Sequence, residues 1–84
     1  MTNRQPIQSI KFYALIPKAN GDAEAKGTFF SVGRVDGKVT AKLWVSFWPS
    51  YIIIHQEMAE GELKSFLYKL DDIVGRVEIV EVSQ

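Results

Sequence analysis

The sequence has no cysteine, no long hydrophobic run and no net charge, and these absences exclude several classes of protein. Without cysteine, neither a disulfide framework nor a thiolate metal site can stabilise the fold. No apolar run has the length of a membrane-spanning helix, and the polar residues 1–6 lack the apolar core of a secretory signal. We therefore expect a cytoplasmic protein that makes no membrane contact.

The chain is short but has enough apolar residues to form one hydrophobic core. It contains 84 residues, of which 46% are hydrophobic and 24% are charged. A chain of this size folds as one unit, near the lower limit for a domain without metal or disulfide. We expect a single domain over residues 1–84, with a flexible N-terminus at 1–6 and a mobile loop at 17–25.

The zero net charge hides an asymmetry between the two parts of the chain. Residues 1–50 contain seven basic and three acidic side chains, or +4, and residues 51–84 contain three basic and seven acidic ones, or −4. Such a split is typical of a protein with a polyanion-binding side, although the same charges would also let the two halves attract each other. Both interpretations stay open at this point.

Two alternating runs meet at Asp36-Gly37, a dipeptide typical of a two-residue hairpin turn. Counting outward from this turn pairs Val35 with Lys38 and predicts one long hairpin over residues 26–48. Its other pairs would include Phe29 with Trp44, among glycines, serines and lysines. The opposite, apolar face would contain Thr28, Phe30, Val32, Val39, Ala41, Leu43, Val45 and Phe47.

The remaining segments predict three more strands and one helix. Residues 7–16 alternate with Ile10, Phe12, Ala14 and Ile16 on one side, residues 51–56 form a β-branched run, and residues 76–82 form a last strand. From Glu60 onward, the apolar residues Leu63, Phe66, Leu67 and Leu70 have the spacing of one helix face. The predicted fold class is therefore α+β, a curved antiparallel sheet in the order β-β-β-β-α-β packed on one α-helix.

This predicted order resembles two known folds. A curved four-stranded sheet followed by a helix is similar to small single-strand-binding coactivator domains, and a small five-stranded sheet with one helix is similar to an OB-fold. The sequence departs from both patterns. The OB-fold helix lies between the third and fourth strands, and the coactivator pattern lacks a strand after the helix.

The sheet face opposite the predicted helix carries aromatic and basic side chains. Aromatic rings interleaved with cations suit single-stranded nucleic acid, because bases stack on the rings and cations contact phosphates. We therefore predict a small protein that binds single-stranded DNA or RNA. The alternative is an interaction module, a homodimer or a protein that binds or inhibits another, using the same face. The predicted site contains Lys11, Tyr13, Phe29, Arg34, Lys38, Lys42, Trp44 and Trp48.

Catalytic and metal-binding groups are sparse in this sequence. His55 is the only histidine, and it lies in an apolar run rather than among the three or four convergent ligands of a zinc site. The adjacent Asp71 and Asp72 fit a solvated helix end better than an acid–base pair. Gly33 to Gly37 lacks the strand–loop–helix context of a phosphate-binding loop. We expect no enzymatic activity, no cofactor and no metal.

Overall fold

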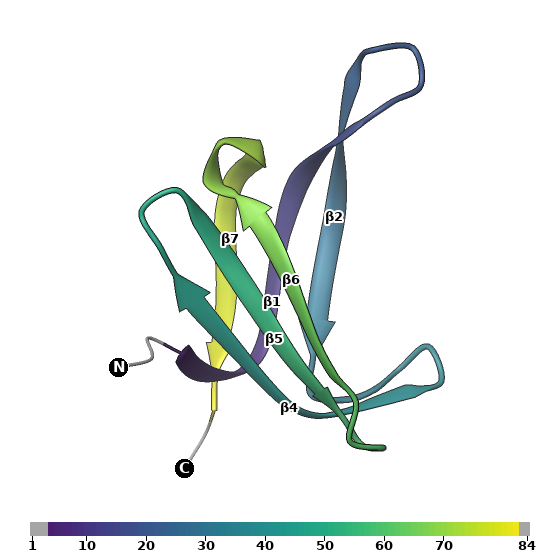
Figure 1. Cartoon of the computed structure of the whole chain (residues 1–84), viewed down its shortest axis with the longest axis vertical. Helices are drawn as coiled ribbons and strands as arrows, with labels where there is room; N and C mark the ends of the chain where they lie inside the picture. The colour runs from purple at the N-terminus through teal and green to yellow at the C-terminus, as the bar shows by residue number, and fades with distance from the viewer. Residues whose placement is uncertain (1–3, 83–84) are drawn as a thin grey trace.

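The computed structural model describes residues 4–82, which form antiparallel strands and one short 3-10 turn (Figure 1). The described part of the chain contains no α-helix. The elements are β1 (Arg4–Pro17), β2 (Ala23–Ser31), β3 (Gly33–Val35), β4 (Lys38–Phe47), β5 (Tyr51–Met58), β6 (Leu63–Lys69), η1 (Leu70–Asp72) and β7 (Ile73–Glu81).

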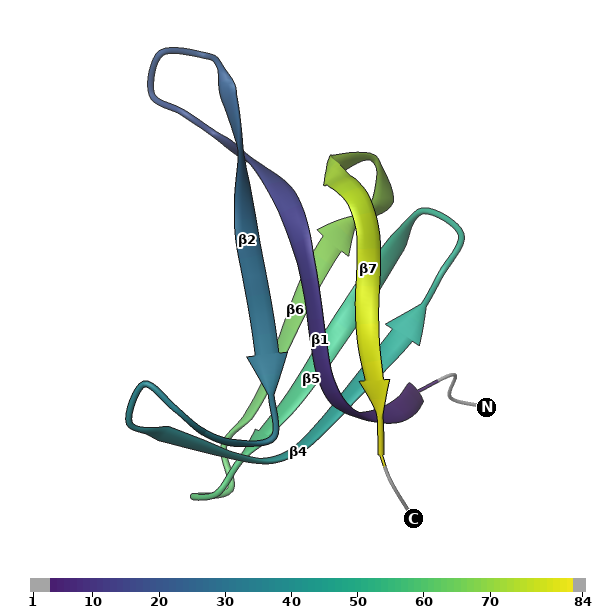
Figure 2. The same ribbon diagram turned by 180° about the vertical axis from the view of Figure 1, so that it is seen from behind.

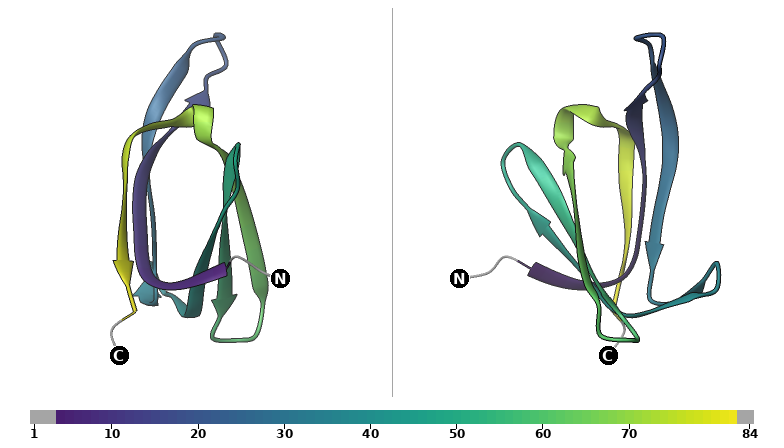
Figure 3. Two further views of the ribbon diagram at one scale, coloured as in Figure 1. Left: turned by 90° about the vertical axis from the view of Figure 1, so that its left-hand side faces the viewer. Right: turned by 45° about the vertical axis from the view of Figure 1, so that its right-hand side comes forward.

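Strand β1 bends and takes part in two layers (Figure 3). Its first residues, Arg4–Pro6, pair with β4, and the remainder lies between β2 and β7. Figure 2 shows this β2–β1–β7 layer, with the β1–β2 hairpin extending beyond it. The second layer consists of β4, β5 and β6, with β3 paired to the start of β4.

The hydrophobic core lies between the two layers. Because successive side chains of a strand point to opposite faces, each long strand gives alternate residues to the core. The fully buried members are Ile7, Ile10, Phe12 and Ala14 of β1, Leu43 and Val45 of β4, and Ile52 and Ile54 of β5. Two aromatic contacts join the layers, Phe12 with Tyr68 at 4.9 Å and Phe30 with Phe66 at 5.2 Å between ring centroids. The predicted inner positions Ile10, Phe12 and Ala14 are confirmed, whereas Ile16 is exposed.

The predicted helix is wrong, and with it the α+β class. Residues 63–69 form strand β6, which pairs with β5 along its length, and only residues 70–72 form a 3-10 turn. Phe66 and Tyr68 point to the core, while Leu63 and Leu67 are exposed at 72% and 58%. The helical spacing was misleading because the period-2 pair Phe66 and Tyr68 carries the packing, and pairing with β5 overrides local periodicity. Both resemblances depended on this helix, which the described part of the chain does not contain.

The predicted turn is confirmed, but the long hairpin is not. Asp36 and Gly37 have positive φ values of 51° and 80°, and Val35 pairs with Lys38. This hairpin ends at Gly33, whose φ of 103° turns the chain away from β4. Strand β2 then pairs with β1, and the Val32 N–H donates to the Gln8 carbonyl at 2.9 Å.

Two segments that were predicted to be flexible contain residues that belong to strands. Residues 4–6 belong to β1, and residues 1–3 lie outside the described part of the chain. Between β1 and β2, only residues 18–22 of the predicted loop at 17–25 are outside the strands. Within residues 4–82, no helix is long and apolar enough to cross a bilayer.

Candidate functional site

The eight predicted site residues lie on separate surfaces. The outer face of the β2–β1–β7 layer carries Lys11, Tyr13 and Phe29, the β3–β4 hairpin carries Arg34 and Lys38, β4 carries Lys42 and Trp44, and Trp48 follows β4. The Trp48 ring stacks on Tyr51 with 5.9 Å between centroids. Lys11, Tyr13 and Phe29 are the three of these residues that share one outer sheet face.

The predicted Phe29–Trp44 pair does not form. Phe29 of β2 lies opposite Lys11, and Trp44 of β4 lies opposite Pro6 and His55. The two aromatic side chains are in different layers because the turn at Gly33 separates β2 from β4. A single surface anchored by both rings is excluded.

Tyr13 and Phe29 lie on one exposed face of adjacent strands. Their side chains are 49% and 54% exposed. Lys11 pairs with Phe29 and Tyr13 pairs with Gly27, so the two rings are diagonal neighbours across β1 and β2. The Tyr13 ring passes over Gly27. A Cβ atom added to Gly27 would lie 3.5 Å from Tyr13 Cε1. Glycine at this position lets the ring lie across β2.

A hollow of about 370 Å³ continues this face from β1 to β7. Its lining includes Lys11, Tyr13 and Arg76. The register of β1 and β7 is irregular here, because Lys11 pairs with Glu78 and Tyr13 pairs with Val74. We call Lys11, Tyr13, Phe29, Arg76 and Glu78 the aromatic face.

Arg76 was not in the predicted site. Gly75, with a φ of 79°, precedes it in β7, and a glycine inside a strand is a signal for a bulge. That signal could have indicated an irregular position but not its place beside Tyr13, which depends on the pairing of the first strand with the last.

The charge of the aromatic face is +1, from Lys11, Arg76 and Glu78. Arg76 Nη2 contacts Glu78 Oε1 at 2.7 Å, so the carboxylate already has a partner. On this face the two halves of the chain mix their charges, because Lys11 of the basic half lies opposite Glu78 of the acidic half. Lys11 is therefore a local cation beside two aromatic rings.

His55 joins three strands of the β4–β5–β6 layer. Its Nε2 lies 2.9 Å from Ser46 Oγ, and its Nδ1 lies 3.2 Å from Ser65 Oγ. Ser46 is only 3% exposed, which leaves no room for a substrate at its hydroxyl. Within residues 4–82, no group of three or more His, Cys, Asp or Glu side chains could hold a metal ion. Sequence reasoning missed both serines, because their approach to His55 requires the register of three strands.

The pKa of His55 is lowered from its usual value of 6.5, first by burial and then by the positive charge of Arg4. In the pH range below 6.5 and above the lowered pKa, the unfolded state binds more protons than the folded state. The free energy of unfolding should therefore fall as the pH drops through this range, and this loss should stop once both states are protonated. Urea unfolding between pH 8 and 5.5 measures it.

The variant His55→Gln is the control for this pH dependence. It removes the titrating ring but keeps a side chain that can hydrogen-bond to serine. Its stability should change less with pH over the same range, because most carboxylates titrate at lower pH. An equal pH dependence in both proteins would show that other groups cause it.

Comparison with known proteins identifies a family that this chain matches. A family model described as Enterobacteria phage T3 gene 1.05 protein matches residues 6–81. The "Uncharacterized gene 1.05 protein" of Enterobacteria phage T3 is 37% identical over 73 residues, which cover 86% of this chain and 78% of that protein. No solved structure matches the chain. The description of the relative names no ligand.

Proposed function

The chain belongs to the Enterobacteria phage T3 gene 1.05 protein family, and we propose that it binds single-stranded DNA or RNA on the aromatic face. The observation that carries this proposal is the pair of exposed rings, Tyr13 and Phe29, beside the cation of Lys11. We further propose that the protein is not an enzyme, needs no cofactor or metal to bind the strand, and acts in the cytoplasm.

The two rings suit stacking with two bases. Diagonal neighbours on adjacent strands lie about 7–8 Å apart at the backbone, within reach of long aromatic side chains. Every base has a π-face, so stacking does not depend strongly on sequence. In a duplex the bases are already stacked and paired. An exposed pair such as Tyr13 and Phe29 therefore favours an unpaired strand.

The cations suit the sugar-phosphate backbone of such a strand. Lys11 lies opposite Phe29, and Arg76 borders the same hollow as Tyr13. The Arg76–Glu78 ion pair is exposed, and exposed pairs contribute little to stability. A phosphate can therefore compete for the guanidinium at small cost, while Lys11 supplies a second contact.

Binding should be measured with a fluorescently labelled oligonucleotide, because Trp44 and Trp48 lie outside the aromatic face. Lys11→Gln should weaken binding of a labelled single strand and reduce the salt dependence of log K by about one charge. Lys42→Gln is the matched control, since Lys42 is an exposed lysine on β4. Its binding curve should match that of the unaltered protein.

Two results of this titration would contradict the proposal. One is the absence of binding to any single-stranded oligonucleotide at low salt. The other is an equal loss of affinity in Lys11→Gln and Lys42→Gln, which would indicate diffuse electrostatic attraction instead of a site. A duplex of the same sequence should bind more weakly than the single strand.

A second candidate function, an interaction module, is supported by a different surface. Leu63 and Leu67 of β6 are 72% and 58% exposed, and β6 is the last strand of its layer. Exposed apolar residues beside an edge strand are typical of association surfaces. A homodimer or a protein partner would bind to this face of β6. It would not use the surface predicted from the sequence, which required Phe29 and Trp44 to lie side by side. Sedimentation of the protein alone tests the homodimer.

A further inference from the structure

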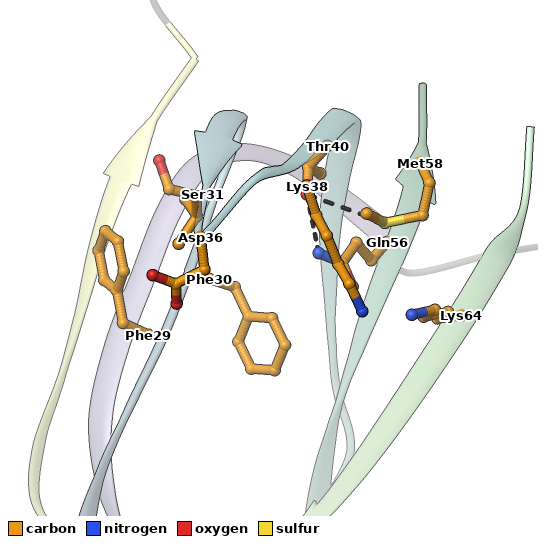
Figure 4. Close-up of a pocket in the computed structure, with 10 residues that line it drawn as sticks. Phe29, Phe30, Ser31, Asp36, Lys38, Thr40, Gln56, Met58 and Lys64 are labelled. Atoms are coloured by element: carbon orange, nitrogen blue, oxygen red, sulfur yellow. Dashed lines mark hydrogen bonds between the residues drawn. The ribbon is translucent and has the colours of Figure 1, made fainter. Parts of the chain in front are cut away.

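An open pocket of about 330 Å³ lies between the two layers, beside the β3–β4 hairpin (Figure 4). The end of β2, the hairpin, β5 and β6 all contribute to its lining. A volume of this size is at the lower end of the range for small-molecule sites. The pocket shares Phe29 with the aromatic face but otherwise uses different residues.

Two lysine side chains reach this pocket from strands β4 and β6 of the same layer. Lys38 follows the Asp36-Gly37 turn, and Lys64 comes from β6. Figure 4 shows both ammonium groups on the same side of the pocket. Lys64 Nζ lies 3.7 Å from Glu62 Oε1, a long contact, and no salt bridge joins Lys38 to another of residues 4–82. Two neighbouring cations favour an anion between them.

The remaining lining is aromatic and polar. In Figure 4 the Phe30 ring lies between the carboxylate of Asp36 and the two ammonium groups. The Phe30 ring is held in place by Phe66, with 5.2 Å between centroids. The Gln56 amide donates to Thr40 Oγ1 at 2.8 Å, and Thr40 is 4% exposed. The pocket therefore has a basic side with two lysines, an apolar centre and an acidic side.

We propose that this pocket binds a nucleoside 5′-monophosphate group. The phosphate lies between Lys38 and Lys64, the base lies against Phe30, and an amino group of the base faces Asp36. Lysine is a common phosphate-binding side chain, and carboxylates accept from the amino group of cytosine. The site does not require the aromatic face, so it stands or falls independently of the proposed strand binding.

The direct test is an NMR titration of the full chain with cytidine 5′-monophosphate. The backbone amides of Lys38, Thr40, Gln56 and Lys64 should shift with saturation. Cytidine alone and inorganic phosphate alone should each bind at least about tenfold more weakly, since each lacks half of the contacts. Phosphate binding as tightly as the nucleotide, or shifts confined to other residues, would overturn the proposal.

Lys64→Gln and Lys69→Gln form a matched pair on strand β6. Lys64 lines the pocket, whereas Lys69 is exposed on the opposite face of the same strand. Lys64→Gln should raise the dissociation constant of cytidine 5′-monophosphate about tenfold, because a charge-assisted hydrogen bond is lost. Lys69→Gln should leave it unchanged. Unchanged affinity in Lys64→Gln would also overturn the proposal.

Two kinds of ligand could supply the nucleoside 5′-monophosphate group: a free nucleotide and the 5′-phosphorylated end of a strand. Oligonucleotides with a 5′-phosphate or a 5′-hydroxyl distinguish them when tested in the Lys11→Gln background. A preference for the phosphorylated strand that disappears in Lys64→Gln assigns the pocket to strand ends. Equal binding of both strands, together with binding of cytidine 5′-monophosphate, assigns it to the free nucleotide. Loss of strand binding in Lys11→Gln with normal nucleotide binding would separate the two sites.

Discussion

Replacing Tyr13 and Phe29 together by alanine should strongly weaken the binding of single-stranded oligonucleotides. Each base stacked on an aromatic ring contributes about 1–3 kcal/mol, so two rings account for about 2–6 kcal/mol. Every 1.4 kcal/mol corresponds to a tenfold change in the dissociation constant. The double variant should therefore bind at least about thirtyfold more weakly, as measured by anisotropy of a labelled strand.

The fold should survive this double substitution, because both side chains are about half exposed. A second aromatic pair provides the control. Trp48 and Tyr51 stack on each other at 5.9 Å outside the aromatic face. Replacing these two by alanine removes comparable aromatic surface and should leave strand affinity unchanged. Equal loss in the two double variants would contradict the assignment of the site.

Replacing Phe12 by alanine should have the largest effect on stability. Phe12 is 1% exposed and contacts Tyr68 edge to face at 4.9 Å, so its removal leaves a cavity between the layers. Substitutions of this type lower the free energy of unfolding by about 3–5 kcal/mol. That is a large share of the total, about 5–15 kcal/mol, for a domain of this kind. Urea unfolding followed by tryptophan fluorescence measures the change.

Phe29→Ala is the matched control for this stability measurement. It makes the same chemical change on the neighbouring strand, where the ring is 54% exposed. Its effect should be much smaller, because most of the ring's surface is not buried on folding. If Phe12→Ala does not fold, Phe12→Leu preserves most of the volume and should give a smaller, measurable loss. A similar loss for Phe12→Ala and Phe29→Ala would mean that the core is not between these layers.

The local sequence pattern was sufficient to predict those features that depend only on neighbouring residues. The alternation of Ile10, Phe12 and Ala14 correctly gave the inner face of β1. The Asp36-Gly37 turn has the expected backbone, because aspartate and glycine tolerate positive φ. These features need no information about distant parts of the chain.

Local pattern failed where distant strands decide the structure. Phe66 and Leu67 fit a helical face and a strand equally well, and only pairing with β5 selects the strand. The hairpin register held to Gly33 and failed beyond it, because β1 competes with β4 for strand β2. The helix and the long hairpin were therefore wrong for the same reason, that long-range pairing overrides local preference.

The same distinction applies to the candidate site. Alternation placed Lys11 and Tyr13 on the outer face of β1, as the structure has them. Their neighbour Phe29 was also assigned to this face, although through pairing with the wrong strand. The separation of Trp44 from Phe29 depends on the pairing of β2 with β1, and the approach of Arg76 depends on the pairing of β1 with β7. Neither was predictable from spacing.

The use of β1 in both layers also constrains how fast the protein can reach this structure. Strand β1 pairs with β2 early in the chain, but it also pairs with β4 and with β7, the last strand. Contacts between distant segments require loop closure before they stabilise anything, and all-β domains of this kind fold in about milliseconds to seconds. During synthesis on the ribosome, the β1–β2 hairpin emerges long before β7. Its apolar inner face stays uncovered in that interval, when a chaperone or another nascent chain can contact it.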